Sequence, residues 1–171
     1  AIAGRVPQIR ALVRPTSQRE FLERHGIRPV SAALDDVDSL RNVVDGPEVI
    51  LHMAGATRAG SEEEFARVNA RGTQALVDAI KSLRSPPRRL IYLSSLAAVG
   101  PALDGRPVGP DDPPRPVTAY GRTKLAGEQI CQELNSTCEV VVLRPPAVYG
   151  PRDRDLYEFF RLANRGLLVA F

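Results

Sequence analysis

The sequence has few of the features that mark membrane and exported proteins. It contains no tryptophan, a single methionine and only 5% aromatic residues. No stretch approaches the roughly 18 consecutive apolar residues that a membrane span needs, and no basic-then-apolar signal pattern opens the chain. We therefore expect a cytoplasmic protein with no membrane partner.

Cysteine and histidine are equally scarce. Cys131 and Cys138 are too few for a disulfide framework and do not form a CxxC pair, so we expect reduced thiols. His25 and His52 do not have the spacing of metal ligands. The sequence therefore predicts no metal site.

Charge of one sign is not concentrated anywhere along the chain. The net charge is +3, and acidic runs at 62–64 and 111–112 interrupt the scattered basic residues. A nucleic-acid-binding surface needs clustered basic residues, so we expect no nucleic acid partner. The modest positive excess suits an anionic small ligand equally well.

Short apolar runs alternate with stretches of helical periodicity. The predicted strands are Ile9 to Val13, Pro29 to Ala33, Val49 to Met53, Leu90 to Leu93 and Val140 to Leu143. Helices are predicted at 17–24, at 38–44, from Ser61 to a stop before Pro86, at 119–134 and from near Asp155. This alternation predicts an α/β fold, a Rossmann-type doubly wound parallel sheet with helices on both faces. The continuous apolar runs predict strands that are covered on both faces.

Ligands of such folds bind at the carboxyl ends of the strands. The predicted strands end at Arg14, at the turn 54–56, at Ser94 and Ser95, and at the segment 144–146. A loop rich in proline and glycine follows at 100–116, and loops of that length are usually functional or mobile.

Tyr120 and Lys124 lie one helical turn apart, so their side chains share a face. A free tyrosine is a poor base near neutral pH because its pKa is about 10. A nearby ammonium favours the phenolate and allows the phenol to exchange a proton with a substrate oxygen. The pair alone is weakly specific and also fits a solvated helix face. Ser95, at the end of a buried strand, adds a hydroxyl that can hydrogen-bond the reacting oxygen.

At this point the chain resembles the extended short-chain dehydrogenase/reductase family, also called the NAD-dependent epimerase/dehydratase family. The likeness is carried by LHMAGAT at 51–57, VNARGT at 68–73, YLSSLAAVGP at 92–101, YGRTKLAGE at 120–128 and LRPPAVYGP at 143–151. Val99 stands where sugar-nucleotide epimerases usually have tyrosine. This form is similar to the 3-beta-hydroxysteroid dehydrogenase and dihydroflavonol reductase branches.

The resemblance implies a role for each matching residue. Tyr120 would be the acid/base, Lys124 would hold the nicotinamide ribose and tune Tyr120, and Ser95 would polarise the substrate oxygen. The implied cofactor-binding residues are Arg14, Leu34, Met53, Ala54, Gly55, Asn69, Tyr120, Lys124, Pro145 and Val148. Asn69 would also brace the strand before Met53 and the active-site helix.

Arg14 bears on the choice of dinucleotide. NAD-preferring members carry an acidic residue there to hold the ribose diol. An arginine can instead pair with the 2′-phosphate of NADP. We therefore expect NADP rather than NAD, with a surface arginine as the alternative interpretation.

The chain departs from the family pattern in two ways. Ala33 stands where the family often has an aspartate that contacts adenine, which leaves Leu34 and the backbone for that contact. The family's first strand and its glycine-rich turn are absent, and the chain opens at 1–4 inside the expected first helix. We expect residues 1–171 to be a partial NAD(P)-binding domain with family strands 2 to 6 and little of the substrate-binding part. The absent strand would lie between the strands that contain Leu12 and Leu51.

The sequence thus predicts an NAD(P)-dependent oxidoreductase or epimerase. When full length, it would act on a secondary alcohol, a ketone or a nucleotide-sugar, a small-molecule substrate; the fragment alone would bind dinucleotide weakly and be inactive. Reduction, oxidation and epimerisation stay open. Dehydration is disfavoured, because Leu96 and Ala97 replace the Asp-Glu pair usual in dehydratases. The alternative is a non-catalytic NAD(P)-binding sensor or structural subunit, although such relatives often lack the tyrosine or the lysine. A homodimer of the full-length protein is also open.

Overall fold

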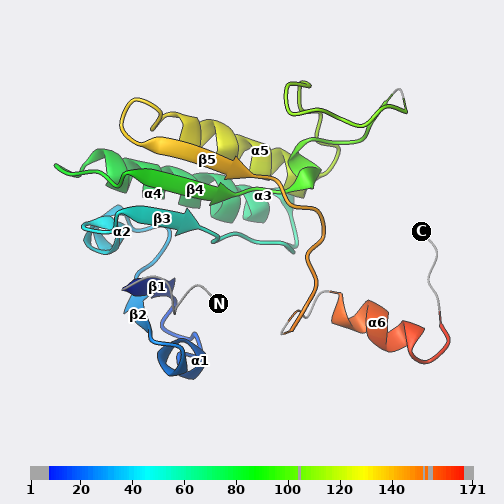
Figure 1. The fold of residues 1–171 in the computed structure, drawn as a ribbon, viewed down its shortest axis with the longest axis horizontal. Helices are drawn as coiled ribbons and strands as arrows, with labels where there is room; N and C mark the ends of the chain where they lie inside the picture. Colours follow the sequence, from blue (N-terminus) through cyan, green and yellow to red (C-terminus); the bar gives the residue numbers. More distant parts are fainter. Residues whose placement is uncertain (1–7, 104, 152, 154–155, 168–171) are drawn as a thin grey trace.

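The described strands form two separate sheets, and the paired strands within each sheet run parallel (Figure 1). The computed structural model describes residues 8–103, 105–151, 153 and 156–167. One sheet pairs β1 (Ile9–Val13) with β2 (Ile27–Ser31), and the other has the order β3 (Val49–His52), β4 (Arg89–Leu93), β5 (Glu139–Leu143). This arrangement confirms the Rossmann-type class of parallel sheets with helices. β1 and β3 do not pair, so the two sheets are separate at the place where the sequence predicts an absent strand, between the strands that contain Leu12 and Leu51.

The helices form the second layer. The short α1 (Glu20–Arg24) contacts β2. The helices that contact the larger sheet or one another include α2 (Val37–Val44), α4 (Gly72–Lys81) and α5 (Ala119–Gln132). The fully buried side chains of the main hydrophobic cluster are Leu40, Val77, Ala79, Ile80, Leu90, Tyr92, Cys131 and Leu134, from this layer and the three-stranded sheet. The core therefore supports the sheet from the side on which α4 and α5 lie (Figure 1).

β3 differs from the expected strand covered on both faces. His52 is buried and Ile50 packs against the core, whereas Val49 is 40% and Leu51 47% exposed. Alternate residues of a strand point to opposite faces. The described helices thus cover only the face of β3 that carries Ile50 and His52.

The second strand begins earlier than the composition predicts. It covers Ile27–Ser31 instead of 29–33, because Gly26 adopts a left-handed φ of 69° and turns the chain directly from α1 into the strand. Pro29 is tolerated in β2, which is an edge strand, since β1 is its only neighbour among the described strands. The helix before it begins at Glu20, three residues after the expected Ser17.

The helix predicted from Ser61 is interrupted by a wider turn. Ser61 Oγ accepts a hydrogen bond from the Glu64 amide, as the capping pattern predicts. The chain then forms α3 (Glu62–Phe65), the π-helix η1 (Ala66–Arg71) and α4. Periodicity did not predict the π-helical turn, which places the buried side chain of Asn69. Such turns are frequent at functional sites.

Two glycines allow α5 to approach the sheet closely. A Cβ on Gly121 would lie 2.2 Å from the carbonyl oxygen of Ala97 in the short helix η2 (Leu96–Ala98). A Cβ on Gly127 would lie 2.1 Å from the hydroxyl oxygen of Tyr92 on β4. Any larger residue would push the helix away. These contacts therefore set the depth of α5, which carries Tyr120 and Lys124.

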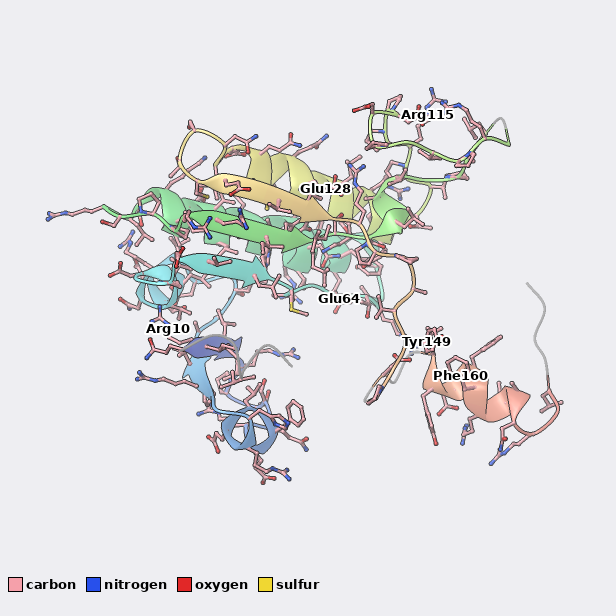
Figure 2. The ribbon with its side chains drawn as sticks, in the orientation of Figure 1. Arg10, Glu64, Arg115, Glu128, Tyr149 and Phe160 are labelled. Atoms are coloured by element: carbon pink, nitrogen blue, oxygen red, sulfur yellow. The ribbon has the colours of Figure 1, made fainter. Side chains whose placement is uncertain are left out.

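The last described helix is α6 (Tyr157–Ala163), which lies apart from the two sheets (Figure 1). The rings of Tyr149 and Phe160 pack together there, with centroids 5.5 Å apart (Figure 2). The predicted helix start near Asp155 and the expected first helix at 1–4 lie outside the described residues. Within the described part of the chain, no helix has the length and apolarity to cross a bilayer.

Candidate active site

The side chain of Lys124 lies in a buried position between α5 and β4. Its Nζ donates a 2.6 Å hydrogen bond to the carbonyl oxygen of Leu93 and lies 4.3 Å from the ring centroid of Tyr92. Only 4% of the residue is exposed. Burial lowers the pKa of Lys124 to about 8, against the opposing effects of Cys131 and Glu128. The lysine therefore carries its charge at neutral pH but gives it up more readily than a surface lysine.

Tyr120 lies one turn before Lys124 in the first turn of α5. Its half-buried ring packs against Phe65 of α3, with centroids 5.9 Å apart. A bidentate ion pair between Arg122 and Glu62 joins the same two helices. Thr118 caps α5 by accepting a hydrogen bond from the Gly121 amide. The start of the helix, and with it Tyr120, is thus held from two sides.

Ser95 stands at the point where β4 gives way to η2. Its Oγ accepts a hydrogen bond from the Ala97 amide at 3.2 Å and so caps that short helix. The close contact of Gly121 with the Ala97 carbonyl brings the start of α5 onto this turn. The structure thus places Ser95 and Tyr120 on contacting segments, which sequence spacing alone only suggested.

Asn69 connects the turn after β3 with α5. Its Oδ1 accepts from the Ala56 amide at 2.7 Å, and its Nδ2 donates to the Ala56 carbonyl and to Thr123 Oγ1. The residue is 1% exposed. The side chain therefore braces these two elements, in the way that the family resemblance implied.

A buried chain of hydrogen bonds continues behind Asn69. The Thr73 hydroxyl donates to the Asn69 carbonyl at 2.7 Å, and His52 Nε2 lies 2.9 Å from the same hydroxyl. Since the one hydroxyl proton of Thr73 is used, His52 Nε2 must be the donor. Burial, and next Lys124, lower the pKa of His52 to about 4, so its ring is neutral. Sequence reasoning had assigned no role to His52 or Thr73.

The turn after β3 forms an open cradle in front of Lys124. Met53, Ala54 and Gly55 are exposed. A Cβ on Gly55 would lie 3.1 Å from Asn69 Oδ1 and 3.8 Å from Lys124 Nζ, so a side chain would fill the space before the lysine. The absence of a side chain at Gly55 thus leaves the space next to Asn69 Oδ1 and Lys124 Nζ unfilled by that residue.

The remaining predicted cofactor residues are more widely distributed. Arg14 is exposed after β1, in a turn whose Ser17 accepts from the Arg14 amide and donates its own amide to the Arg14 carbonyl. Leu34 packs against Gly72 of α4 and so also serves the core. Pro145 accepts a hydrogen bond from the Leu96 amide, whereas Val148 is 72% exposed. Arg14 thus follows a strand of the smaller sheet, whereas the predicted catalytic residues Ser95, Tyr120 and Lys124 lie beside the larger one.

A buried ion pair beside the site has no counterpart among the residues predicted from the sequence. Glu128 on α5, labelled in Figure 2, accepts hydrogen bonds from the Ser94 hydroxyl and from two nitrogens of Arg144. The available signal was spacing, because Glu128 follows Lys124 by four residues and so lies on the same helix face. Ser94, expected only to end its strand, is part of this network.

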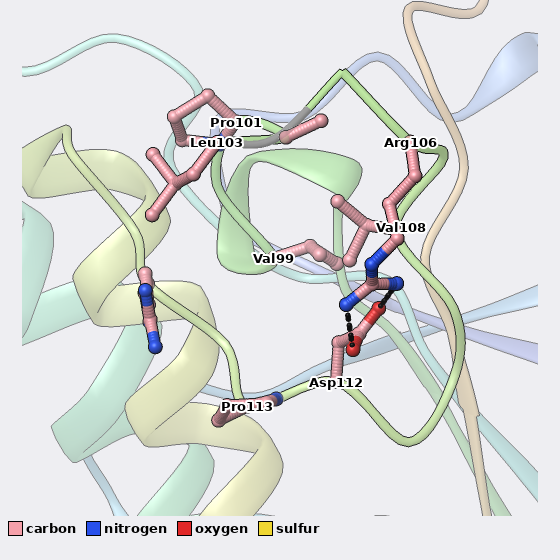
Figure 3. Close-up of a pocket in the computed structure, with 9 residues that line it drawn as sticks. Val99, Pro101, Leu103, Arg106, Val108, Asp112 and Pro113 are labelled. Atoms are coloured by element: carbon pink, nitrogen blue, oxygen red, sulfur yellow. Dashed lines mark hydrogen bonds and ion pairs between the residues drawn. The ribbon is translucent and has the colours of Figure 1, made fainter.

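The loop at 100–116 encloses a pocket of about 250 Å³ next to η2 (Figure 3). Its lining is mixed: Val99, Leu103 and Val108 contribute apolar side chains, and a bidentate ion pair between Arg106 and Asp112 lies at one side (Figure 3). Gly100, with a φ of 88°, and the hydrogen bond from the Arg115 amide to the Val99 carbonyl close the base of the loop. The loop thus has an ordered base.

Cys131 and Cys138 are both free and buried, as expected for reduced thiols. Burial raises the pKa of Cys131 to about 12, so this thiol is unreactive. The residues that the structure describes include no cluster of three or more His, Cys, Asp or Glu that could hold a metal ion.

Known proteins resemble this chain in sequence and in fold. The chain is 32% identical to a ceramide reductase from Caulobacter vibrioides over 91% of this chain and 43% of that protein. It is 28% identical to a 3 beta-hydroxysteroid dehydrogenase/Delta 5-->4-isomerase of vaccinia virus over 78% of this chain and 42% of that protein. The chain thus spans less than half the length of these curated relatives.

A UDP-glucuronic acid 4-epimerase from Bacillus cereus, solved in complex with NAD, superposes with a TM-score of 0.76 at 24% identity. The match covers 93% of this chain and 55% of that one, and it shows the shared fold. Residues 2–166 match the family described as NAD dependent epimerase/dehydratase. The chain belongs to the NAD dependent epimerase/dehydratase family.

Proposed function

We propose that this chain carries the proton-transfer apparatus of an NAD(P)-dependent oxidoreductase or epimerase. The observation that carries the proposal is the buried Lys124 ammonium, held against the end of β4 one helical turn from Tyr120. A buried cation at this spacing stabilises a phenolate. A lysine on a solvated helix face would not be buried in this way.

Tyr120 would move the proton. In the oxidative direction, the alcohol O–H proton would pass to the Tyr120 phenolate, and a bound NAD(P) would supply the acceptor for the carbinol hydride. In the reductive direction, the Tyr120 hydroxyl protonates the oxygen of the carbonyl that receives the hydride. Ser95 donates a hydrogen bond to the same oxygen and orients it. General acid–base catalysis of this kind contributes about 10²- to 10⁴-fold.

The cofactor would lie along the carboxyl ends of the strands, where NAD(P) supplies hydride acceptance and donation. The exposed backbone of Met53, Ala54 and Gly55 would contact it, with Asn69 and Lys124 behind that turn. Pro145 would border the nicotinamide side. Arg14, exposed at the end of β1, would pair with a 2′-phosphate, so we propose NADP in preference to NAD.

The substrate would be a small molecule with a secondary alcohol or a ketone. The relatives include a ceramide reductase, a hydroxysteroid dehydrogenase, whose name states an alcohol substrate, and a UDP-glucuronic acid 4-epimerase. The pocket of the loop at 100–116 lies next to η2, where such a substrate would enter, and offers it both apolar and charged side chains. The presence of both Tyr120 and Lys124 disfavours a purely structural or sensor role.

An isotope experiment with a set of labelled alcohols tests hydride transfer by the full-length gene product. The protein would be incubated with NADP⁺ or NAD⁺ and with secondary alcohols and UDP-hexoses deuterated at the carbinol carbon. We expect deuterium on the nicotinamide ring or, for an epimerase, back on the same sugar carbon. Exchange of that deuterium with solvent, or no reaction with any member of the set while NADP(H) binds tightly, would overturn the proposal.

A further inference from the structure

The carboxylate of Glu128 joins three segments of the site at one point. It is 2% exposed, and it accepts a hydrogen bond from the Ser94 hydroxyl. Arg144 Nε donates to its Oε1 at 2.9 Å and Arg144 Nη2 to its Oε2 at 2.6 Å. A buried charge is tolerated only when it is paired and hydrogen-bonded in this way.

Each of these contacts adjoins a residue of the proposed active site. Ser94 lies between Leu93, whose carbonyl holds Lys124, and Ser95. Leu93 and Ser94, which are consecutive at the end of β4, are therefore bound by side chains on consecutive turns of α5. Arg144 precedes Pro145, whose carbonyl accepts from the amide next to Ser95. The three segments that carry the chemistry are thus cross-linked through one side chain.

We propose that Glu128 is a positioning residue of this site, which through Ser94 and Arg144 holds the Ser95 turn and the Pro145 segment in register with Tyr120 and Lys124. This inference rests on the proposed function, since the register matters for proton transfer. Glu128 contacts none of the reacting atoms. Its effect passes through the hydroxyl and the guanidinium that it binds.

The same carboxylate also acts on the charge of Lys124. The titratable groups around the lysine are Glu128 and Cys131 on α5, Tyr92 on β4 and His52 on β3, with Tyr120 one turn away. Of these, Glu128 is the anion, and it raises the pKa of Lys124 against the effect of burial. Arg144, bound to Glu128, carries the opposite charge, so we expect it to act on Lys124 in the opposite sense. Loss of the carboxylate and loss of the guanidinium should therefore have opposite effects on the lysine.

This opposition can be measured directly on the chain. Lys81 and Lys124 are its two lysines, so lysine-selective ¹³Cε NMR gives two titrating signals, which Lys81→Arg assigns. Glu128→Gln should lower the pKa of Lys124, Arg144→Gln should raise it, and the double variant should lie between. Lys81, paired with Glu133 at the surface, should not change. Equal shifts in one direction, or none, would overturn the electrostatic part of the inference.

Turnover of the full-length gene product tests the positioning part. Ser94→Ala and Glu128→Gln should each lower kcat roughly tenfold to a hundredfold with little change in KM, the scale for misplaced reacting groups. Ser94→Ala removes no charge, so it should leave the pH profile unchanged, whereas Glu128→Gln should move the alkaline limb to lower pH. Glu133→Gln is the matched control and should leave kcat unchanged.

The outcomes separate this inference from the proposed function. Wild-type turnover that Ser94→Ala leaves intact, in a folded variant, would overturn the positioning role and leave the proposed function standing. Absence of any turnover by the wild-type protein would count against the proposed function. The NMR experiment would still decide whether Glu128→Gln and Arg144→Gln shift the pKa of Lys124 in opposite directions. If Glu128→Gln does not fold, Ser94→Ala and the double variant carry the test.

Discussion

Lys124 Nζ donates a 2.6 Å hydrogen bond to the main-chain oxygen of Leu93, two residues before Ser95. This bond ties the lysine to the strand end that carries the proposed substrate-orienting serine. It also gives the buried ammonium a hydrogen-bond acceptor, which reduces the penalty of burial. The position of the cation is therefore set by the sheet as well as by the helix on which it lies.

Gly127→Ala should destabilise the protein. The new Cβ would lie 2.1 Å from the Tyr92 hydroxyl oxygen in a core that has no free space at this point, so the helix or the ring must shift. We expect a loss of about 1–3 kcal/mol in the free energy of unfolding, the usual range for overpacking. Urea denaturation of the wild-type and variant chains measures it.

Two variants make this prediction specific. Gly60→Ala adds the same methyl group where the nearest atom, Glu64 Oε2, is 3.7 Å away, so it should be nearly neutral. Tyr92→Phe removes the hydroxyl and should recover part of the stability of Gly127→Ala, although the ring carbon remains 2.8 Å from the new Cβ. A Gly127→Ala chain as stable as Gly60→Ala would contradict the packing described here.

His52 should make stability depend on mildly acidic pH. Its pKa is lowered to about 4 by burial and then by Lys124, whereas an exposed histidine has a pKa of about 6.5. Between these values the unfolded chain binds a proton that the folded chain does not. The contribution of neutral His52 to the free energy of unfolding is therefore complete above about pH 6.5. It declines as the pH falls towards 4, by ~3 kcal/mol in all.

Urea denaturation at several pH values between 7 and 4 measures this dependence. In His52→Gln the amide can still donate to Thr73 but does not titrate, so the slope over this range should be smaller than in the wild type. The matched control is His25→Gln, since the His25 side chain is exposed at the end of α1. Identical slopes for His52→Gln and the wild type would show that His52 does not titrate as described.

Arg14→Ala should weaken NADPH binding by the full-length gene product much more than NADH binding. A charge-assisted hydrogen bond contributes about 1.5–3 kcal/mol, which corresponds to a Kd change of roughly tenfold to a hundredfold. Arg28→Ala on the exposed side of β2 is the control for lost surface charge. Fluorescence titration with both dinucleotides measures the effect; tighter binding of NADH than of NADPH by the wild type would refute the NADP preference.

The elements with the strongest local signals could be predicted from the sequence. β1, β4 and β5 match their apolar runs to within one residue, and Ser61 caps its helix as its spacing to Glu64 implies. The placement of Tyr120 and Lys124 on one helix also follows from spacing alone. These features depend on residues close together in the chain.

Features that depend on tertiary contacts could not be predicted. The π-helical turn at Asn69 is tied to partners 13 and 54 residues away, at Ala56 and Thr123, which periodicity does not include. The pairing of Glu128 with Arg144 likewise joins a helix to the end of a strand. Whether a face of β3 is exposed depends on which elements pack against it. The apolar composition of the strand does not contain that information, and the burial on both faces that it suggested was wrong.

The most direct test of the proposed acid/base centre is turnover by Tyr120→Phe in the full-length gene product, beside Tyr149→Phe as the control. Tyr149 is 69% exposed and packs on Phe160 of α6, so its hydroxyl has no place in the proposed chemistry. We predict that Tyr120→Phe lowers kcat by about 10²- to 10⁴-fold at saturating NAD(P). Tyr120→Phe turnover equal to that of Tyr149→Phe would contradict the assignment of Tyr120 as the group that moves the proton.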